Sequence, residues 1–592
     1  MSDLSKRIAD LPPEKRQLLL RRLAEQEKKA PVPGVPVAEA WPVRDASQPA
    51  PLSFAQQRLW FLEQLQPGNA LYNLLMVIRL EGTLDAAVLE KSFNALLQRH
   101  EALRTVFVER DGQPLQIISP PVALRLPVEE LGPIPVAEQE QEIRRLAGEE
   151  VRRPFDLTQG PLLRMRLLKL DAQAHVLVLT VHHIVFDGWS QAVLLRELET
   201  FYDAFLTGKV PSLPALPVQY ADYALWQRQW LRGTVLDNQL AYWKEKLRGP
   251  PPMTELRGDR PRPALRTTQG ARLFVELPRP LSEALAALSR QEGATLFMTL
   301  MAALKTLLFR YTQQTDITTG YVTAGRGRRE VEGLIGFFVN TLALRVDLSG
   351  APSFRTVLAR TRVASMEAFE HQEVPFEQLV DALQLERDLS RSPLFQVMLV
   401  HQPLSKARLE LPGLSLKSLD IQPETAKFDL TLLLHDTDRG TLAGSWEYNT
   451  DLFEADTIAR LAKHYEQLLQ SIVAHPDQRI TELAMMTADE RQQVLEGWNQ
   501  TSAEYPREQC VHQLFEAQAE RTPEAVAVRS GNEQVTYGEL NRRANQLAHL
   551  LVKKGVGPET LVGLCTERTV DTVVGLLGIL KAGGAYVPLD PA

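Results

Sequence analysis

The chain contains 592 residues, of which 44% are hydrophobic and 23% charged, and its formal net charge is −7. This composition is typical of a globular protein of several domains, and the negative balance argues against a chain built mainly to bind nucleic acid. Its two cysteines, Cys510 and Cys565, exclude a disulfide framework and a cysteine-rich zinc site. No apolar run reaches the ~18 residues of a membrane helix, and the N-terminus lacks the apolar core of a secretory signal. We therefore expect a cytoplasmic protein without membrane or nucleic-acid partners.

The first 50 residues differ from the rest of the chain. Residues 1–30 place leucines at helical spacing between lysines and arginines, which is typical of an amphipathic helix. Residues 31–50 are rich in Pro and Ala and predict an extended linker. Two uses of the helix remain open: a leader that packs on the next domain, or a docking helix for an upstream protein.

From residue 51 to about residue 475 strand and helix patterns alternate, which predicts a mixed α/β fold. The run VLVLTVHH is nearly continuously apolar, the mark of a strand buried on both faces. Periodicity predicts strands over 71–82, 176–183, 316–325 and 340–348, helices over 84–100, 190–208, 281–293, 295–313 and 456–475, and a hairpin over 428–453.

The C-terminal part has a different texture. Residues 476–510 are polar and predict a linker. Helices and strands alternate again over 511–592, but this length is too short to close the core of a typical α/β domain.

One cluster of polar residues stands out, directly after a buried strand and before a helix. It reads His182-His183-Ile-Val-Phe-Asp187-Gly188-Trp189-Ser190. Side chains alternate across a strand, so two adjacent histidines cannot both face a cleft. Imidazole accepts a proton near neutral pH, the aspartate can hold the turn, and the glycine lets the backbone approach a substrate closely. The cluster therefore predicts a site for general-base catalysis or for positioning a nucleophile.

Three other interpretations of this cluster are chemically possible. The histidines could ligate a metal, but no HExxH spacing accompanies them. A Ser-His-Asp triad could form, but no GxSxG nucleophile elbow occurs. The histidine pair could also be merely structural, and the adjacent Asp187-Gly188 argues against that.

HHIVFDGWS resembles the signature of condensation domains of non-ribosomal peptide synthetases, which are similar to chloramphenicol acetyltransferase. Six more segments resemble the family's other motifs in family order. They are LSFAQQRLWFLEQL (52–65), RHEALRTVF (99–107), YADYALWQRQ (220–229), IGFFVNTLALR (335–345), HQEVPFEQLV (371–380) and RDLSRSPLFQVML (387–399). In the tail, VTYGELN (535–541) and LKAGGAYVPLDP (580–591) resemble the first two motifs of amino-acid adenylation domains.

This resemblance implies a fold. Two chloramphenicol-acetyltransferase-like lobes of α/β (α+β) type are expected to form a V-shaped pseudo-dimer, with the active site in a tunnel between them. The N-lobe would span 51–220 and the C-lobe 221–475. After the linker, residues 511–592 would be an incomplete adenylation domain.

The resemblance also suggests roles for the residues of the signature. His183 would lie in the tunnel as the catalytic histidine, and His182 would be structural. Asp187 would form an intramolecular ion pair, for which Arg104 is the expected partner, because an unpaired buried carboxylate is costly. The Gly188 N–H could support the oxyanion.

Three supporting candidates complete the expected site. The second lobe would offer Asn340 to the tunnel, and Trp189 and Ser190 belong to the signature itself. No metal and no bound cofactor are expected, because phosphopantetheine arms would arrive on partner carrier proteins.

The implied reaction is aminolysis of a thioester, which makes the chain an amide-bond-forming acyltransferase. A donor carrier is expected upstream and in trans, since no carrier precedes the domain after Met1, and an acceptor carrier downstream. The texture of the later motifs favours joining an L-configured donor to an L-amino acid. A starter domain that N-acylates with a fatty acyl group, or a non-catalytic carrier-docking platform, remain alternatives. Adenylation is not expected, because the phosphate loop of that family lies beyond the matched motifs.

Overall fold

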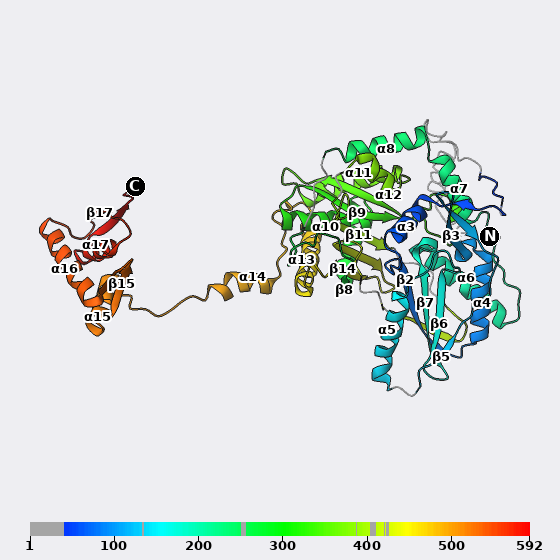
Figure 1. The fold of residues 1–592 in the computed structure, drawn as a ribbon, viewed down its shortest axis with the longest axis horizontal. Coiled ribbons are helices and arrows are strands. Elements are labelled where there is room, and N and C mark those ends of the chain that lie inside the picture. Colours follow the sequence, from blue (N-terminus) through cyan, green and yellow to red (C-terminus); the bar gives the residue numbers. More distant parts are fainter. Residues whose placement is uncertain are drawn as a thin grey trace, which may run out of the picture. The chain divides into compact units, whose positions relative to one another are not determined.

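The computed structural model describes residues 41–591 apart from 46, 133–134, 250–255, 386–387, 403–409, 420 and 422–424 (Figure 1). The chain divides into two units, Met1–Thr487 and Ala488–Ala592. The predicted helix over 1–30 and the first ten residues of the predicted linker lie outside the described residues. No single described helix is long and apolar enough to cross a membrane. The helices Arg279–Gln291 and Leu296–Thr312 meet the length and composition test only as a pair, across a bend of 104°.

The N-lobe of the first unit is built on a five-stranded sheet with the order β12-β2-β7-β6-β5. Its central strand β7 (Ala174–His182) is buried at all nine positions, as its apolar run predicts. Helices α4 and α6 pack on one face of this sheet and α5 on the other. The remaining elements are α3 (Phe54–Leu65), β2 (Asn73–Gly82), α4 (Ala86–Arg99), β5 (Val128–Glu130), α5 (Val136–Arg152), β6 (Leu163–Lys169) and α6 (Gly188–Leu206).

A small sheet, β1-β4-β3, lies beside this lobe and is formed by β1 (Ala50–Pro51), β3 (Thr105–Arg110) and β4 (Gln113–Ile118). Arg44, which precedes β1 and lies within the predicted linker over 31–50, is fixed by ion pairs. Arg44 is nearly buried and pairs with Glu101 at 2.5 Å and with Asp222 at 2.8 Å. Two carboxylates thus fix the end of a segment whose composition alone predicts a free tether.

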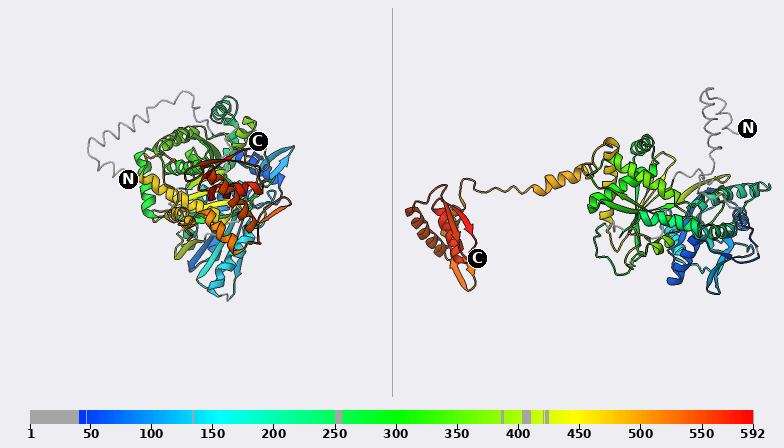
Figure 2. Two further views of the ribbon diagram at one scale, coloured as in Figure 1. Left: turned by 90° about the vertical axis from the view of Figure 1, so that its left-hand side faces the viewer. Right: turned by 90° about the horizontal axis from the view of Figure 1, so that it is seen from above.

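The C-lobe is a six-stranded sheet with the order β10-β9-β11-β13-β14-β8, which Figures 1 and 2 show from different sides. Helix α10 is its central helix, because twelve consecutive residues, Met298–Phe309, are buried. The elements are α7 (Tyr220–Trp230), α8 (Thr234–Lys246), β8 (Gly270–Leu277), α9 (Arg279–Gln291), α10 (Leu296–Thr312), β9 (Asp316–Thr323), β10 (Asn340–Asp347), α11 (Phe354–Glu370), α12 (Phe376–Leu383), β11 (Val397–Gln402), β13 (Leu430–Asp436), β14 (Leu442–Asn449) and α13 (Ala455–Ala474).

Strand β12 (Leu414–Leu419) breaks the predicted division into lobes. It follows β11 in the chain but pairs antiparallel with β2 of the N-lobe, from Leu414 opposite Gly82 to Leu419 opposite Val77. A continuous C-lobe over 221–475 therefore does not describe the structure. Strand β2 would otherwise be an apolar edge, and β12 supplies its missing hydrogen bonds.

The linker also begins later than predicted. Ile480 and Leu483 are fully buried in the C-lobe core, and Ile480 N–H donates to Pro352 O at 3.0 Å. The second unit starts with helix α14 (Ala488–Leu495), none of whose residues is buried.

The second unit holds two small sheets, β15-β16 and the parallel pair β17-β18. Its small core includes Val535, Leu540 and Val570, whereas β18 is exposed at all five positions. Its elements are α15 (Val511–Arg521), β15 (Val526–Ser530), β16 (Glu533–Thr536), α16 (Tyr537–Lys553), β17 (Leu561–Cys565), α17 (Val570–Lys581) and β18 (Ala585–Leu589).

Candidate active site

The two adjacent histidines at the end of β7 have different surroundings. His182 is the last residue of the strand and is buried in the N-lobe, where its ring lies edge-on to Phe155 at 6.0 Å. Its Nδ1 accepts a hydrogen bond from Ile184 N–H at 3.2 Å. Burial, with the neighbouring His183, lowers the pKa of His182 to about 3. These contacts place the His182 ring inside the N-lobe, and its structural role stays a prediction.

His183 begins a short 3₁₀ turn and leans toward the C-lobe, where its ring lies 4.7 Å from the ring of Phe337. Its Nδ1 is 2.7 Å from Phe186 O. A carbonyl oxygen can only accept, so Nδ1 carries the proton and Nε2 keeps a free lone pair. The backbone N–H of His183 donates to Tyr72 O at 2.8 Å, which fixes the turn.

The charge state of His183 is set by its neighbourhood. Burial, and then the positive charge of Lys427, lower the pKa of His183 to about 3, so the imidazole is neutral near pH 7. Lys427 itself lies 5.2 Å from the ring centroid of Tyr72. Burial lowers the pKa of this lysine to about 8, against the opposing effect of Glu447.

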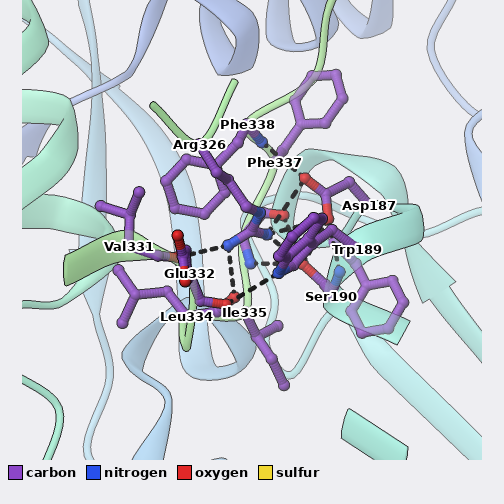
Figure 3. Close-up of polar contacts among 12 residues, drawn as sticks. Asp187, Trp189, Ser190, Arg326, Val331, Glu332, Leu334, Ile335, Phe337 and Phe338 are labelled. Atoms are coloured by element: carbon purple, nitrogen blue, oxygen red, sulfur yellow. Dashed lines mark hydrogen bonds and ion pairs between the residues drawn. The ribbon is translucent and has the colours of Figure 1, made fainter. Parts of the chain in front are cut away.

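Asp187 caps helix α6 and ties it to the C-lobe (Figure 3). The carboxylate is fully buried, and its Oδ1 accepts from Ser190 N–H and Ser190 Oγ, each at 2.7 Å. Its Oδ2 accepts from Phe338 N–H at 3.0 Å, and Arg326 Nη2 donates to Oδ1 at 3.1 Å. Both oxygens of this buried charge thus face donors, which is the condition for burying it.

The ion-pair partner of Asp187 is Arg326 and not Arg104, so that prediction was wrong. Arg104 donates to Ser119 O at 2.6 Å and lies 3.7 Å from Glu101. Arg326 is buried and also donates to Val331 O and Leu334 O, at 2.7 and 2.8 Å. The signal for Arg326 in the sequence is the arginine-rich run after the strand of residues 316–323, but nothing local connects that run to residue 187.

Ser190 and Trp189 extend the connection between the lobes. Ser190 Oγ accepts from Gly336 N–H at 3.0 Å and lies 2.9 Å from Gly336 O, an alternative acceptor for the proton that it donates to Asp187. Trp189 is exposed, yet its Nε1 donates to Glu332 O at 2.9 Å (Figure 3). Both side chains therefore position the 332–338 segment of the C-lobe.

A second buried connection between the lobes was not predicted from the sequence. His100, in the RHEALRTVF segment, has its Nε2 2.7 Å from Glu197 Oε2 and accepts from Ile335 N–H at Nδ1, at 3.3 Å. Arg99 Nε also donates to Glu197, at 3.0 Å. This histidine joins α6 to the same C-lobe segment that Asp187 holds.

The condensation-domain family matches residues 46–495, most of the chain. This chain belongs to the condensation-domain family. The AMP-binding enzyme family matches residues 515–592, which covers the second unit from α15 onward. The family resemblance and the acyltransferase class expected from the signature are thereby confirmed.

Curated relatives point to the same class of protein. The chain is 51% identical over 547 residues to a subunit of linear gramicidin synthase from Brevibacillus parabrevis, covering 92% of this chain and 11% of that protein. It is 42% identical over 593 residues to phosphinothricin tripeptide synthetase PhsC of Streptomyces viridochromogenes, covering 100% of this chain and 54% of that protein. The chain spans about half or less of the length of these relatives.

Solved structures share the fold. The X-domain from teicoplanin biosynthesis is 31% identical with a TM-score of 0.68, over 76% of this chain and 100% of that one. A four-domain nonribosomal peptide synthetase bound to AMP and glycine has a TM-score of 0.79 at 24% identity, over 94% of this chain and 42% of that one. The predicted α/β class of the condensation domain is confirmed.

Within the condensation domain, Gly188 is the first residue of α6 and is exposed. A Cβ at this position would stand 3.3 Å from Gln402 Nε2, so any larger residue would narrow the gap to β11. Ser190 N–H is used by Asp187, whereas the N–H groups of Gly188 and Trp189 have no partner inside the helix. They carry the partial positive charge of the helix N-terminus.

Asn340 opens strand β10 and uses its amide to hold a loop. Its Nδ2 donates to Gln372 O and to Val374 O, both at 2.7 Å, and its Oδ1 accepts from Thr341 N–H at 2.9 Å. These bonds make Asn340 a support for residues 372–374.

Two pockets each include one residue that lies beside the histidine signature. The first is the Glu373 pocket, and Phe337, the ring partner of His183, lines it. The second is the Gln402 pocket on the strands of the C-lobe sheet, and Gln402 faces Gly188. The two linings share no residue. Further residues of the Glu373 pocket are Phe54, Arg58, Tyr223 and Asn340, and of the Gln402 pocket Arg272, Phe274, Leu433 and Ser445.

Proposed function

We propose that this condensation domain forms an amide bond between two carrier-bound substrates. One is a donor acyl or peptidyl thioester, and the other is an aminoacyl group with a free α-amine. The observation that carries this proposal is the position of His183. Its Nε2 has no hydrogen-bond partner among the described residues. Phe337, which contacts the His183 ring, lines one pocket, and Gln402, which lies beside Gly188, lines another.

The reaction requires no group beyond the two substrates and the protein. The amine nitrogen attacks the thioester carbonyl, a tetrahedral oxyanion forms, and the C–S bond then breaks. The amine loses one proton and the departing sulfur gains one, so the products are an amide and a free thiol. Holding both tethered substrates in register supplies much of the rate acceleration.

His183 acts on the neutral amine. An α-ammonium has a pKa near 8, and transferring its proton to an imidazole of pKa about 3 would cost about 7 kcal/mol. Nε2 therefore accepts a hydrogen bond from the attacking amine and orients its lone pair. It takes up proton density only as the C–N bond forms and the nitrogen becomes acidic.

The oxyanion is stabilised at the start of α6. The N–H groups of Gly188 and Trp189 lie at the helix N-terminus, directly after His183 and the Asp187 cap. Asp187 does not take part in proton transfer, because its oxygens are fully used by Arg326, Ser190 and Phe338. It keeps the N-terminus of α6 in place instead.

The partners follow from the substrates. An upstream carrier, acting in trans, presents the donor on its phosphopantetheine arm, and a downstream carrier presents the acceptor, in the cytoplasm. We favour the joining of an L-configured donor to an L-amino acid. The AMP-binding part within 515–592 is not expected to activate amino acids by itself.

Two alternatives make different products. A starter domain would transfer a fatty acyl group to an aminoacyl carrier. A docking platform would bind a protein partner without forming a product, and one relative, the X-domain from teicoplanin biosynthesis, was solved in a complex with OxyB.

The test is direct. Purified protein is mixed with one loaded donor carrier and one loaded acceptor carrier, drawn from peptidyl, L-aminoacyl and fatty acyl sets, and products are identified by mass spectrometry. A dipeptidyl product that the His183→Ala variant does not make supports the proposal. An N-acyl product from fatty acyl donors alone identifies a starter domain, and tight carrier binding without any product identifies a platform.

A further inference from the structure

The Glu373 pocket contains a carboxylate that nothing in the described structure neutralises. Two glutamates line this pocket, and one of them, Glu377, pairs with Arg58 at 2.8 Å. Glu373 has no hydrogen bond or ion pair among the described residues. It is partly buried, and desolvation raises the pKa of its carboxyl. A partly desolvated carboxylate without a partner among the described residues points to a cationic ligand.

The backbone on both sides of Glu373 is held firmly. Asn340 donates to the carbonyls of Gln372 and Val374, the residues directly before and after it. Behind them, Trp243 Nε1 donates to His371 O at 2.8 Å. These three hydrogen bonds hold the backbone of the loop that carries Glu373.

The Gln402 pocket offers a different chemistry. Its carboxylate, Glu276, accepts a hydrogen bond from Thr441 Oγ1 at 2.8 Å, and its arginine, Arg272, pairs with Glu447 at 2.5 Å. The rest of its lining includes Phe274, Val400 and Leu433. It suits an uncharged acyl chain better than a free cation.

We propose that Glu373 binds the α-ammonium of the acceptor aminoacyl group and takes one proton from it before the amine reaches His183. This inference rests on the proposed function and adds to it the side on which the acceptor enters. The balance is simple: the ammonium and the carboxylate become a neutral amine and a carboxylic acid, and no other reactant is needed. Desolvation raises the pKa of Glu373, which makes this transfer less uphill than transfer to a solvated carboxylate.

The location of Glu373 fits this order of events. It shares its pocket with Phe337, whose ring lies 4.7 Å from the His183 ring, so one side chain separates the pocket from the imidazole. His183 is too weak a base to deprotonate an ammonium, as its pKa of about 3 shows. A separate proton acceptor earlier on the path resolves this difficulty.

Binding is tested first, because it does not depend on turnover. The probes are glycyl-pantetheine and acetyl-pantetheine with an amide in place of the thioester, which differ only in the α-amine. Calorimetry is performed with wild-type chain, Glu373→Gln, Glu373→Asp and the exposed control Glu370→Gln. We expect Glu373→Gln to weaken the glycyl probe roughly 10- to 100-fold and to leave the acetyl probe unchanged, since hydrogen bonds to charged groups carry this much affinity. Glu373→Asp should be intermediate.

Turnover with a productive carrier pair gives a second readout. Glu373→Gln should raise KM for the acceptor carrier and leave KM for the donor carrier unchanged. Its rate should rise with pH up to the amine pKa near 8, as the free amine fraction grows, whereas wild type varies less. The other ionisable groups lining this pocket are Tyr223 on α7, Arg58 on α3 and Glu377 on α12, and all three are retained in the variant.

The two measurements distinguish a failure of the Glu373 assignment from a failure of the proposed function. Equal losses for both probes, no loss for either, or a raised donor KM would overturn the assignment of Glu373. Melting temperatures of the variants identify a merely structural effect. If wild type discriminates between the probes through Glu373 but yields no amide with any carrier pair, the inference stands and the proposed function fails.

Discussion

The two lobes contribute to the site in different ways. The N-lobe provides its share within nine consecutive residues, from His182 to Ser190, at a strand end and a helix start. The C-lobe provides Arg326, Phe338 and Asn340 from a loop, a second loop and a strand. The residues of the signature are thus adjacent in the chain, whereas the C-lobe groups that contact or support them are dispersed. A compact motif therefore reveals the reacting group, while the groups that hold it are dispersed.

The largest effect should come from the N-lobe side. His183→Ala removes the imidazole that we propose orients the amine, and we expect the condensation rate to fall about 10²- to 10⁴-fold without loss of fold. His182→Ala should mainly lower the melting temperature, because this ring packs on Phe155. Rates and thermal unfolding are measured on both. Full activity in the His183 variant would contradict the assignment of His183 as the group that acts on the amine.

The next effect concerns the bond between the lobes. Asp187→Asn and Arg326→Ala each leave one member of a buried pair alone, and each should lower the free energy of unfolding by about 3–5 kcal/mol. Chemical denaturation of both singles and the double variant gives their coupling. Arg104→Ala is the control and should show no coupling to Asp187. Additive losses from Asp187 and Arg326 would mean that their contact contributes nothing.

A smaller effect is expected from the C-lobe support alone. Asn340→Ala frees the carbonyls of Gln372 and Val374, which should cost about 1–3 kcal/mol of stability. Asn499 also donates to two carbonyls, but in an exposed turn, so Asn499→Ala is a matched control with a much smaller cost. If Asn340 supports Glu373, its variant also raises the acceptor KM. If Asn340→Ala changes neither the acceptor KM nor the free energy of unfolding, Asn340 does not support Glu373.

The smallest effect is electrostatic. Lys427→Met removes a positive charge near His183, so the pKa of this histidine should rise above about 3, and NMR titration of histidine-labelled protein can follow it. Lys427→Arg keeps the charge and should keep the pKa.

Both signature histidines have a pKa of about 3 in place of the ordinary 6.5. As the pH falls below about 6.5 the unfolded chain binds protons first, so the free energy of unfolding decreases down to about pH 3. Lys427→Met removes an unfavourable charge, so its free energy of unfolding should decrease less steeply with falling pH. Chemical denaturation of both proteins at several pH values measures this difference.

The sequence was informative where structure is local. The apolar run before His182 predicted a strand buried on both faces, and β7 is buried throughout. Alternation across that strand also predicted that the two histidines face different surroundings. The error over Arg104 has a physical origin. An ion pair depends on the packing of two lobes, and residues 139 positions apart leave no periodicity from which the contact could be read.

The same limit explains Glu373 and β12. Glu373 lies in a recognised motif, HQEVPFEQLV, but its importance comes from the lack of a partner among the described residues, which only coordinates reveal. Strand β12 largely alternates half-buried and exposed positions, an ordinary pattern that fits the edge of either sheet. Pattern establishes that a strand exists, and only packing establishes which strand it pairs with.

The pairing of β12 with β2 also affects how the protein is made. Strand β2 is complete once residue 82 has been synthesised, but its partner ends more than three hundred residues later, at Leu419. During translation the apolar edge of β2 therefore stays unpaired until most of the C-lobe has been synthesised. Such long-range pairing slows folding and exposes an edge to wrong partners. An exchange of lobes between related synthetases at the end of α6 would separate β2 from the strand that closes it, so viable hybrids must carry both strands from one parent.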